Sequence, residues 1–258
     1  MSARRSEPRE RGRHRASGSS DRNDTLNALR TAVCDANIEL SSRGLARFTF
    51  GNASGIDRAL GIVVIKPSGV PYDELQPDSL VAVDMDGRVV EGTLRPSSDL
   101  PTHLVLYRAF PAIGGIVHTH SHYATVWAQS QREIPCLGTT HADYFHGAIP
   151  ITTHLPQSDI HSEYETNTGK AIVRRFHDLD PTRMPAVLVA GHASFCWGRS
   201  VRHAVETASI LEDVARMAYD TVTLNAAVDP IPGALLDKHF SRKHGPDSYY
   251  GQLEGPAL

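Results

Sequence analysis

The sequence contains few cysteines, and their positions exclude several classes of protein. Among its 258 residues there are only three, Cys34, Cys136 and Cys196, and no two of them form a CxxC pair. Three scattered cysteines cannot build the disulfide framework on which small secreted domains depend. None has a nearby base motif that would activate it as a nucleophile. We therefore expect a protein of a reducing compartment, the cytoplasm, without cysteine-based catalysis.

Long apolar runs are also missing. No stretch of about 18 uncharged apolar residues is present, so no membrane-spanning helix is expected. No apolar segment follows Arg4 and Arg5, so the h-region of a signal peptide is lacking. Hydrophobic residues make up 40% of the chain and charged residues 21%, which is typical of globular proteins rather than of disordered or collagen-like chains.

Positive charge is concentrated at the N-terminus. Residues 1–22 contain seven arginines and three acidic residues, whereas the whole chain has a formal net charge of −3, so the remainder carries −7. Because residues 1–22 contain no aliphatic side chain larger than alanine, we expect a disordered extension. A basic arm can bind nucleic acid or serve in targeting. The preferred interpretation is a solvated extension, with no nucleic-acid or membrane partner.

Apolar patterning in the rest of the chain predicts one α/β domain over residues 23–252, followed by a tail at 253–258. Helical periodicity and caps indicate four helices. The first begins at Asn23 or Asp24, the next two cover residues 102–110 and 122–130, and the last begins at Ser200. Short apolar runs predict strands at 47–50, 61–69, 114–120 and 186–192. Residues 79–92 are typical of a hairpin with a type I′ turn at Asp86 and Gly87.

Histidines at the ends of two predicted strands indicate a metal site. His118 and His120 are two residues apart, so both imidazoles point to the same face of a strand. His192 ends a second apolar strand, and it would join the pair if the two strands were neighbours. Asp99, before the 102–110 helix, could add an oxygen ligand. Three imidazoles and a carboxylate suit zinc or a similar divalent ion, although a chain with fourteen histidines also forms such pairs by chance.

Polar loops after the strands are candidates for phosphate binding. Lys66, Ser68 and Gly69 follow one predicted strand, and glycine lets backbone amides approach an anion. Ser97 and Ser98 precede a helix whose N-terminal amides favour an anion, and Asn52 lies in a further loop. Neither a Walker pattern nor a dinucleotide glycine pattern is present. The alternative is that these residues form ordinary turns.

Long motifs resemble one known family. The segments GNAS, IKPSGVPYDEL, VVEGTLRPSSDLPTHLVLYRAFPAIGGIVHTHSHYATVWAQ, GTTHADYFHGAIP and DKHFSRKHGPDSYYGQ are similar to the L-ribulose-5-phosphate 4-epimerases of the class II aldolase/epimerase superfamily. The resemblance runs from about residue 24 to 252. It implies a three-layer α/β/α subunit around a nine-stranded, largely antiparallel sheet. It also implies a homotetramer with active sites between subunits, a phosphorylated ketopentose substrate and a divalent metal, with zinc expected and manganese or cobalt as alternatives.

The resemblance assigns roles to particular positions. Its metal ligands correspond to Asp99, His118, His120 and His192. Its phosphate-binding residues correspond to Ser68, Gly69, Ser97 and Ser98, with Asn52 and Lys66 nearby. Its acid and base correspond to Asp143 and Tyr250, supplied across the subunit interface. Further polar site residues correspond to Thr139, Glu165, His239 and Arg242.

Related functions on the same fold are the alternatives. Sugar-phosphate aldolases of the superfamily carry glutamate where this chain has Asp99, so the aspartate favours the epimerase branch. A non-catalytic interaction module would be expected to lose the metal ligands, which this chain keeps. Small departures from the epimerase pattern occur at residues 190–194 and at His146, where tyrosine is common. The resemblance does not decide whether the enzyme would serve arabinose or another pentose route.

Overall fold

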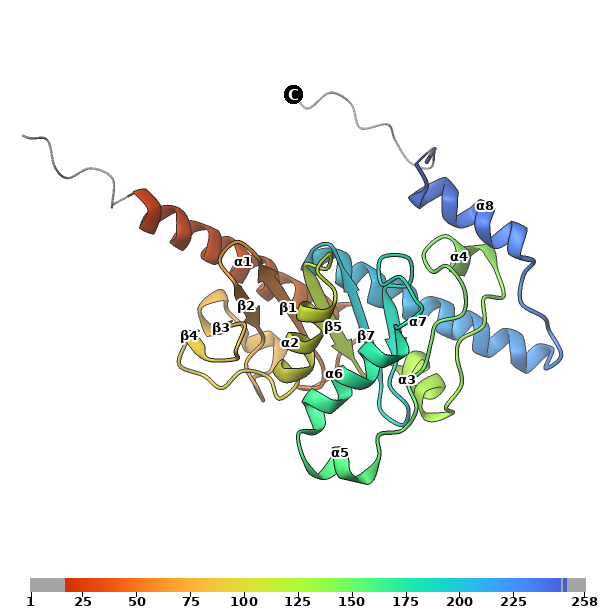
Figure 1. Ribbon diagram of the computed structural model, residues 1–258, viewed down its shortest axis with the longest axis horizontal. Helices are drawn as coiled ribbons and strands as arrows, with labels where there is room; N and C mark the ends of the chain where they lie inside the picture. The colour runs from red at the N-terminus through yellow and green to blue at the C-terminus, as the bar shows by residue number, and fades with distance from the viewer. Residues whose placement is uncertain (1–16, 247, 250–258) are drawn as a thin grey trace, which may run out of the picture.

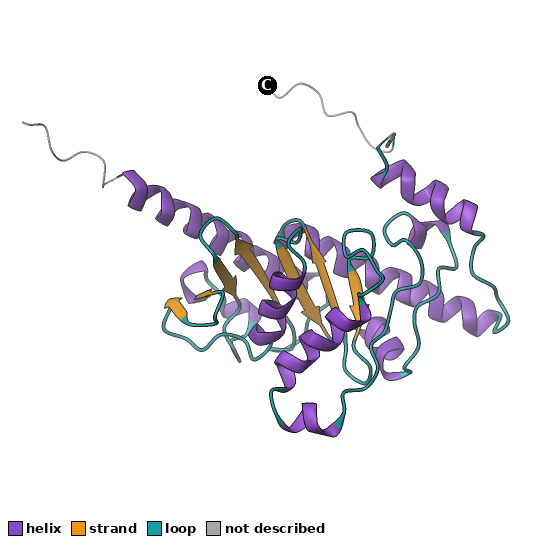
Figure 2. Ribbon diagram, viewed as in Figure 1, coloured by secondary structure: helices purple, strands orange, loops and turns teal. Residues whose placement is uncertain are grey.

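The protein is built on one antiparallel sheet. The computed structural model describes residues 17–246, 248 and 249. Within them, seven strands pair in the order β4-β3-β2-β1-β5-β7-β6, and every pair is antiparallel (Figure 2). Their bounds are β1 Asn52–Asp57, β2 Ile62–Ile65, β3 Val81–Asp84, β4 Val89–Glu91, β5 Gly115–Thr119, β6 Ala186–Leu188 and β7 Ser194–Gly198. The expected nine strands are therefore wrong for the described residues.

Single bridges occur beside these ladders. Pro67 pairs with Pro96, and Ile151 pairs in parallel with Leu188, but neither contact extends into a strand. The Pro67–Pro96 bridge is flanked by two backbone bonds, from Ser68 N to Arg95 O and from Ser97 N to Lys66 O, both at 2.9 Å.

Helices cover both faces of the sheet (Figure 1). On one face lie α1 (Ser17–Ser42) and α7 (Val201–Leu224), which contact β1, β5 and β7. On the other face lie α2 (Leu100–Ala109) and α6 (Tyr164–Arg175), which pack against each other. Ser54 of β1 is within hydrogen-bond distance of two α2 side chains, at 2.7 Å from His103 Nδ1 and 2.8 Å from Tyr107 Oη. The expected three-layer α/β/α arrangement is confirmed.

The remaining helices are short or lie beside the sheet. They are α3 (His122–Gln129), α4 (Thr139–Ala142), α5 (Gln157–His161) and α8 (Gly233–His244), with two 3₁₀ turns at Tyr72–Glu74 and Pro77–Ser79. Helix α8 lies beyond the β6 edge and packs on α4 (Figure 1). Within the described part of the chain, no helix is both long and apolar enough to cross a membrane. All three cysteines are buried and free.

A row of three glycines lets α1 and α7 lie close to the sheet. Gly55, Gly115 and Gly198 are neighbours on β1, β5 and β7. A Cβ at Gly55 would meet Leu29 of α1 at 2.9 Å, and a Cβ at Gly115 would overlap the backbone of Val201 at the start of α7. Strands β1, β5 and β7 therefore carry no side chain where the helices cross them.

We expect the substitution Gly115→Ala to lower the free energy of unfolding by about 3 kcal/mol or more, because backbone would have to move to admit the methyl group. Chemical denaturation of the metal-free protein measures the change. Gly233→Ala is the matched control, since no atom lies within 4 Å of its Cβ position. Equal stability of the Gly115 and Gly233 variants would contradict the packing role of the glycine row.

Three local predictions from the sequence are corrected. Helix α1 begins at Ser17, so the last part of the extension expected at residues 1–22 is helical, and residues 1–16 lie outside the described residues. Residues 47–50 form a turn rather than a strand, in which Phe50 N donates to Arg47 O at 3.0 Å. The β3–β4 hairpin is present, but a type I′ turn needs two positive φ angles and only Gly87 has one, at 82°.

Candidate metal centre and phosphate pocket

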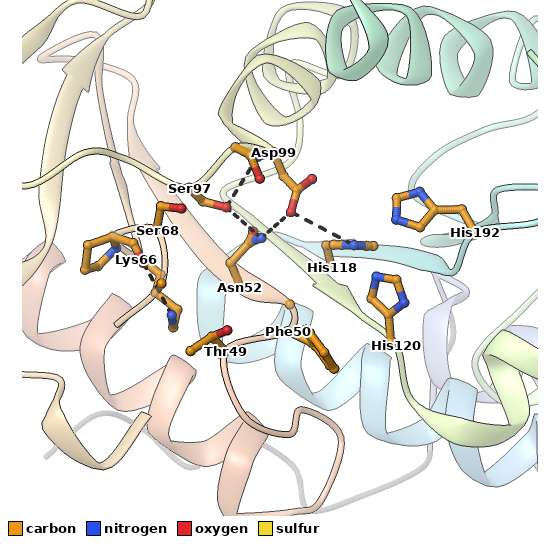
Figure 3. A pocket seen from close by; sticks show the side chains of 14 residues that line it. Thr49, Phe50, Asn52, Lys66, Ser68, Ser97, Asp99, His118, His120 and His192 are labelled. Carbon is orange, nitrogen blue, oxygen red and sulfur yellow. Dashed lines mark hydrogen bonds and ion pairs between the residues drawn. The ribbon is translucent and has the colours of Figure 1, made fainter. Parts of the chain in front are cut away.

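Three imidazoles meet at one end of β5 (Figure 3). His118 lies on β5, His120 directly follows it, and His192 lies in the turn between β6 and β7. One ligand atom of each lies within 4.8 Å of the others. His192 would join the pair, on the sequence pattern, if β6 lay beside β5. In the structure β7 separates those strands, and its Phe195 pairs with His118. The β6–β7 turn carries His192 back to the pair.

A hydrogen bond and a stacking contact fix the orientation of the His118 ring. Its Nδ1 lies 2.9 Å from the backbone carbonyl of Ser194. A carbonyl oxygen can only accept, so Nδ1 is the donor, and in the neutral form of the ring the lone pair is then on Nε2. The ring also stacks on Phe195, with centroids 4.3 Å apart and planes at 18°. This orientation leaves Nε2 directed toward the other imidazoles.

Asp99 lies beside the three histidines. It occupies the N-cap position of α2 but makes no side-chain capping bond there. Its Oδ2 instead accepts a hydrogen bond from Asn52 Nδ2 at 2.7 Å and lies 4.0 Å from His118 Nε2. The same Asn52 nitrogen donates to Ser97 Oγ at 3.0 Å. Asn52 thus ties the carboxylate to the loop that precedes α2.

Local electrostatics suit a cation held by these four residues. Burial, and then the neighbouring imidazoles, lower the pKa of His120 and of His192 to about 4. Burial acts to raise the pKa of Asp99, but the neighbouring histidines and the hydrogen bond from Asn52 together outweigh it, so this pKa is lowered overall. Both imidazoles are therefore neutral and the carboxylate is ionised at neutral pH. Neutral imidazoles and an ionised carboxylate are the forms that ligate a divalent metal, so the donor set fits one.

Tyr164 of α6 is placed to orient His192. Its Oη lies 3.4 Å from His192 Nδ1. A hydrogen bond to Nδ1 leaves Nε2 as the ligand atom. Outer partners of metal-bound histidines usually orient the ring in this way.

We expect Tyr164→Phe to weaken metal binding about tenfold. Competition with a chromogenic chelator measures this, and unchanged affinity would contradict the role.

The polar loops form the other half of the same cavity. A pocket of about 350 Å³ is lined by the metal-site residues and by the candidate phosphate-binding residues, namely Asn52, Lys66, Ser68, Gly69, Ser97, Ser98, Asp99, His118, His120 and His192. The structure therefore brings together the two groups that the sequence indicated separately. This volume is in the range of small-molecule sites.

Two backbone amides of the polar loops are already paired within the fold. The amide of Ser68 donates to Arg95 O and that of Ser97 donates to Lys66 O, both at 2.9 Å, which binds the two loops together. Lys66 Nζ donates to Val70 O at 2.6 Å and to Pro67 O at 3.3 Å. An ammonium has three donors, so one remains for a ligand. Burial lowers the pKa of Lys66 to about 8, which leaves the ammonium mostly protonated at neutral pH.

Sequence reasoning missed Thr49, Phe50 and Gly51, which also line the cavity. They were assigned to a strand and its end, whereas they form a turn that Tyr72 clamps by donating to the carbonyls of Phe50 and Gly51, both at 2.9 Å. Gly51 was the feature of the sequence that could have indicated this turn. Its φ is 82° and a Cβ there would meet His118 O at 2.6 Å, so a glycine is required beside the metal site.

A second polar group lies outside this cavity. Asp143, which ends α4, accepts hydrogen bonds from Arg242 Nε at 2.9 Å and Arg242 Nη2 at 2.6 Å. His239 Nδ1 lies 2.9 Å from Asp143 Oδ1. Burial acts to raise the pKa of Asp143, but Arg242 and His239 outweigh it, so the pKa lies below its ordinary value. Asp143, His239 and Arg242 are thus brought together between α4 and α8, apart from the metal-site cavity.

The other candidates are distributed among these regions. Thr139 begins α4, and Glu165 lies on α6, where its backbone carbonyl accepts from Thr102 Oγ1 at 2.6 Å. His146 Nε2 is 2.8 Å from Asp237 Oδ1 on α8. Two further neighbours of Asp143 were missed, Lys243 at 4.0 Å and His244, whose Nε2 lies 2.9 Å from the Asp143 carbonyl. Tyr250 lies outside the described residues.

Comparison with known proteins gives consistent matches over most of the chain. Residues 31–219 match the family model of class II aldolase and adducin N-terminal domains. L-ribulose-5-phosphate 4-epimerase UlaF of Salmonella paratyphi B (strain ATCC BAA-1250 / SPB7) is 52% identical over 227 residues, which cover 88% of this chain and 100% of the relative. The corresponding enzyme of Salmonella paratyphi C (strain RKS4594) is 51% identical with the same coverage.

Solved structures show the same fold. An L-fuculose 1-phosphate aldolase superposes with a TM-score of 0.71 at 24% identity, covering 83% of this chain and 95% of its own. The L-fuculose-1-phosphate aldolase of Thermus thermophilus superposes with a TM-score of 0.61 at 22% identity, covering 79% and 98%. At these sequence identities, the superpositions support a shared fold.

Proposed function

The chain belongs to the family of class II aldolases and adducin N-terminal domains, and we propose that it is an L-ribulose-5-phosphate 4-epimerase. The observation that carries the proposal is a single cavity that joins three imidazoles and Asp99 to the polar loops of Lys66 and Ser97. A sugar phosphate needs both halves. The epimerases at 52% and 51% identity match this chain over their whole length.

The reaction defines what the site must do. The two epimers, L-ribulose 5-phosphate and D-xylulose 5-phosphate, differ only at C4, which bears no acidic proton. Inversion can therefore proceed by retro-aldol cleavage between C3 and C4, rotation of the glycolaldehyde phosphate and re-addition of the dihydroxyacetone enediolate. Asp99, His118, His120 and His192 would hold the divalent ion, which when bound supplies Lewis-acid stabilisation of the developing negative charge.

The phosphate half of the cavity retains the mobile fragment. The ammonium of Lys66 and the hydroxyls of Ser68, Ser97 and Ser98 would hold the phosphate, with Gly69 leaving room at the loop. A fragment held at one end can turn its aldehyde without leaving, so re-addition stays effectively intramolecular. Release of the fragment instead would be aldolase activity.

Proton transfer at the C4 oxygen requires groups on opposite faces of the substrate. We assign these roles to Asp143 and Tyr250 as a carboxylate and a phenol. The lowered pKa of Asp143 makes it a carboxylate at neutral pH, so it enters the reaction as a proton acceptor. His239 and Arg242 hold it in place through the hydrogen bonds described above, with Thr139 and Glu165 as further polar residues of the assembled site.

The proposal includes a homotetramer with active sites between subunits. Asp143 and its partners do not line the cavity that holds the histidines, so a neighbouring subunit is needed to bring the two groups to one substrate. Helix α8, which carries His239 and Arg242, has only Phe240 buried. It therefore retains surface for a subunit contact. Zinc is the proposed ion because of the imidazole-rich donor set, and the buried free cysteines are consistent with a cytoplasmic enzyme.

A coupled assay tests the function. Purified protein is expected to convert L-ribulose 5-phosphate into D-xylulose 5-phosphate, to lose this activity after treatment with a chelator, and to regain it when zinc, manganese or cobalt is added. Absence of D-xylulose 5-phosphate from metal-loaded protein would contradict the proposal.

A further inference from the structure

The three histidines of the metal site differ in what fixes their rings. His118 is held by the Ser194 carbonyl and by Phe195, and His192 is held by Tyr164. Among the described residues, no hydrogen bond is made to the ring of His120, whose ring neighbours are Phe50, His118 and His192. His120 lies after the last residue of β5, in the two-residue connection to α3. Its position therefore depends on how that connection is held.

The start of α3 is held from outside by Glu212. Ser121 occupies the N-cap position, where serine usually accepts a bond from the first turn, but it makes none. Its Oγ is buried without a partner in the described part of the chain. Instead, Glu212 Oε1 accepts from Tyr123 N at 2.8 Å and Oε2 accepts from Ala124 N at 3.0 Å. Both carboxylate oxygens thus satisfy the first-turn amides, where negative charge is also favoured by the helix dipole.

Glu212 is itself on a rigid element. It lies on α7, whose first turns cross the glycine row and contact β5 and β7. The chain of contacts thus leads from the sheet through α7 and Glu212 to the first turn of α3, and from there over one residue to His120. Charge-assisted bonds to two amides are stronger than neutral ones, so Glu212 holds the first turn of α3 more firmly than a neutral cap would.

We propose that Glu212 is a positioning residue for metal binding, which sets the orientation of His120 by capping α3. The inference rests on the metal site of the proposed function. Without the carboxylate, the two amides lose their acceptors and the connection after β5 is free to rearrange. The site would then keep His118 and His192 in place but lose its third imidazole. A residue that only stabilises the fold would leave metal affinity unchanged.

The test measures zinc affinity by chelator competition in Glu212→Gln, Glu212→Ala and the control Asp213→Asn, whose side chain is exposed on the same helix. Glutamine keeps one acceptor and places an amide against the other N–H, so it is expected to bind zinc more weakly than the unmodified protein. Alanine is expected to weaken binding by about tenfold or more, as loss of outer-shell partners does. The control is expected to bind as the unmodified protein does. Thermal unfolding without metal shows whether each variant is folded. If the alanine variant does not fold, the zinc affinity of the glutamine variant decides the test.

A double substitution separates positioning from general stability. In a His120→Ala background, Glu212→Gln is expected to cause no further loss of zinc affinity, because its effect passes through His120. Unchanged affinity in the single variants, or an equal loss in both backgrounds, would overturn the positioning role. If the unmodified protein bound no zinc, the metal site of the proposed function would fail, and this inference with it.

Discussion

Replacing His118 with asparagine is expected to abolish tight metal binding and to lower the turnover of L-ribulose 5-phosphate by at least about 10³-fold. Lewis-acid stabilisation by a bound metal is worth several kcal/mol, and each 1.36 kcal/mol corresponds to about tenfold in rate. His118 is the most constrained of the three imidazoles, because Ser194 and Phe195 fix its ring. Metal content and steady-state rates of the purified variant measure both effects.

His122→Asn is the matched control for this substitution. His122 is exposed and lies two residues after His120 in the sequence, but it is not part of the triad. The control is expected to keep its metal and its activity. Full and chelator-insensitive activity of the His118 variant would rule out a metal-dependent mechanism at this site.

The substitution Asp143→Asn is expected to lower turnover by about 10²–10⁴-fold, the usual contribution of a positioned acid or base. The metal content is expected to stay unchanged. The amide is nearly the same size as the carboxylate but cannot accept a proton. It also weakens the contacts with Arg242 and His239. Asp237→Asn is the control, because Asp237 pairs with His146 in the same region without a proposed part in proton transfer. Unimpaired turnover in the Asp143 variant would remove it from the mechanism.

Mixing the two inactive variants tests where the site is assembled. If Asp143 of one subunit serves the metal site of another, co-expressed His118→Asn and Asp143→Asn chains should form some sites with both groups intact. Part of the activity should then return, although neither variant is active alone. Failure of activity to return in verified mixed oligomers would place both groups of a working site in one chain.

The sequence was informative where the chemistry follows local periodicity. His118 and His120 share a side because strand side chains alternate, and Pro101 correctly indicated that a helix begins after Asp99. The sequence pattern also placed His192 at the end of a second apolar strand, and the structure joins it to the pair by the β6–β7 turn rather than by a β5–β6 pairing. Strand order depends on long-range pairing, which residue spacing alone does not determine.

Other features depended on contacts that no local pattern contains. The turn at residues 47–50 has apolar residues typical of a strand, but Phe48 has a φ of 56° and Tyr72 clamps the carbonyls that follow. The contact between Asp143 and Arg242 joins residues 99 positions apart. Glu212 caps α3 from 89 residues away in place of the adjacent serine. In each case tertiary packing overrides a local preference.

The central claim is that one metal-dependent site cleaves and re-forms the C3–C4 bond without losing the fragment. Following the conversion of L-ribulose 5-phosphate by ³¹P NMR in one vessel, with and without chelator, tests this most directly. The account predicts that D-xylulose 5-phosphate accumulates toward equilibrium in the metal-loaded sample, that no free glycolaldehyde phosphate appears, and that the chelated sample does not react. Accumulation of free glycolaldehyde phosphate at the rate of substrate loss would show an aldolase instead, and conversion that persists in the chelated sample would contradict the metal site.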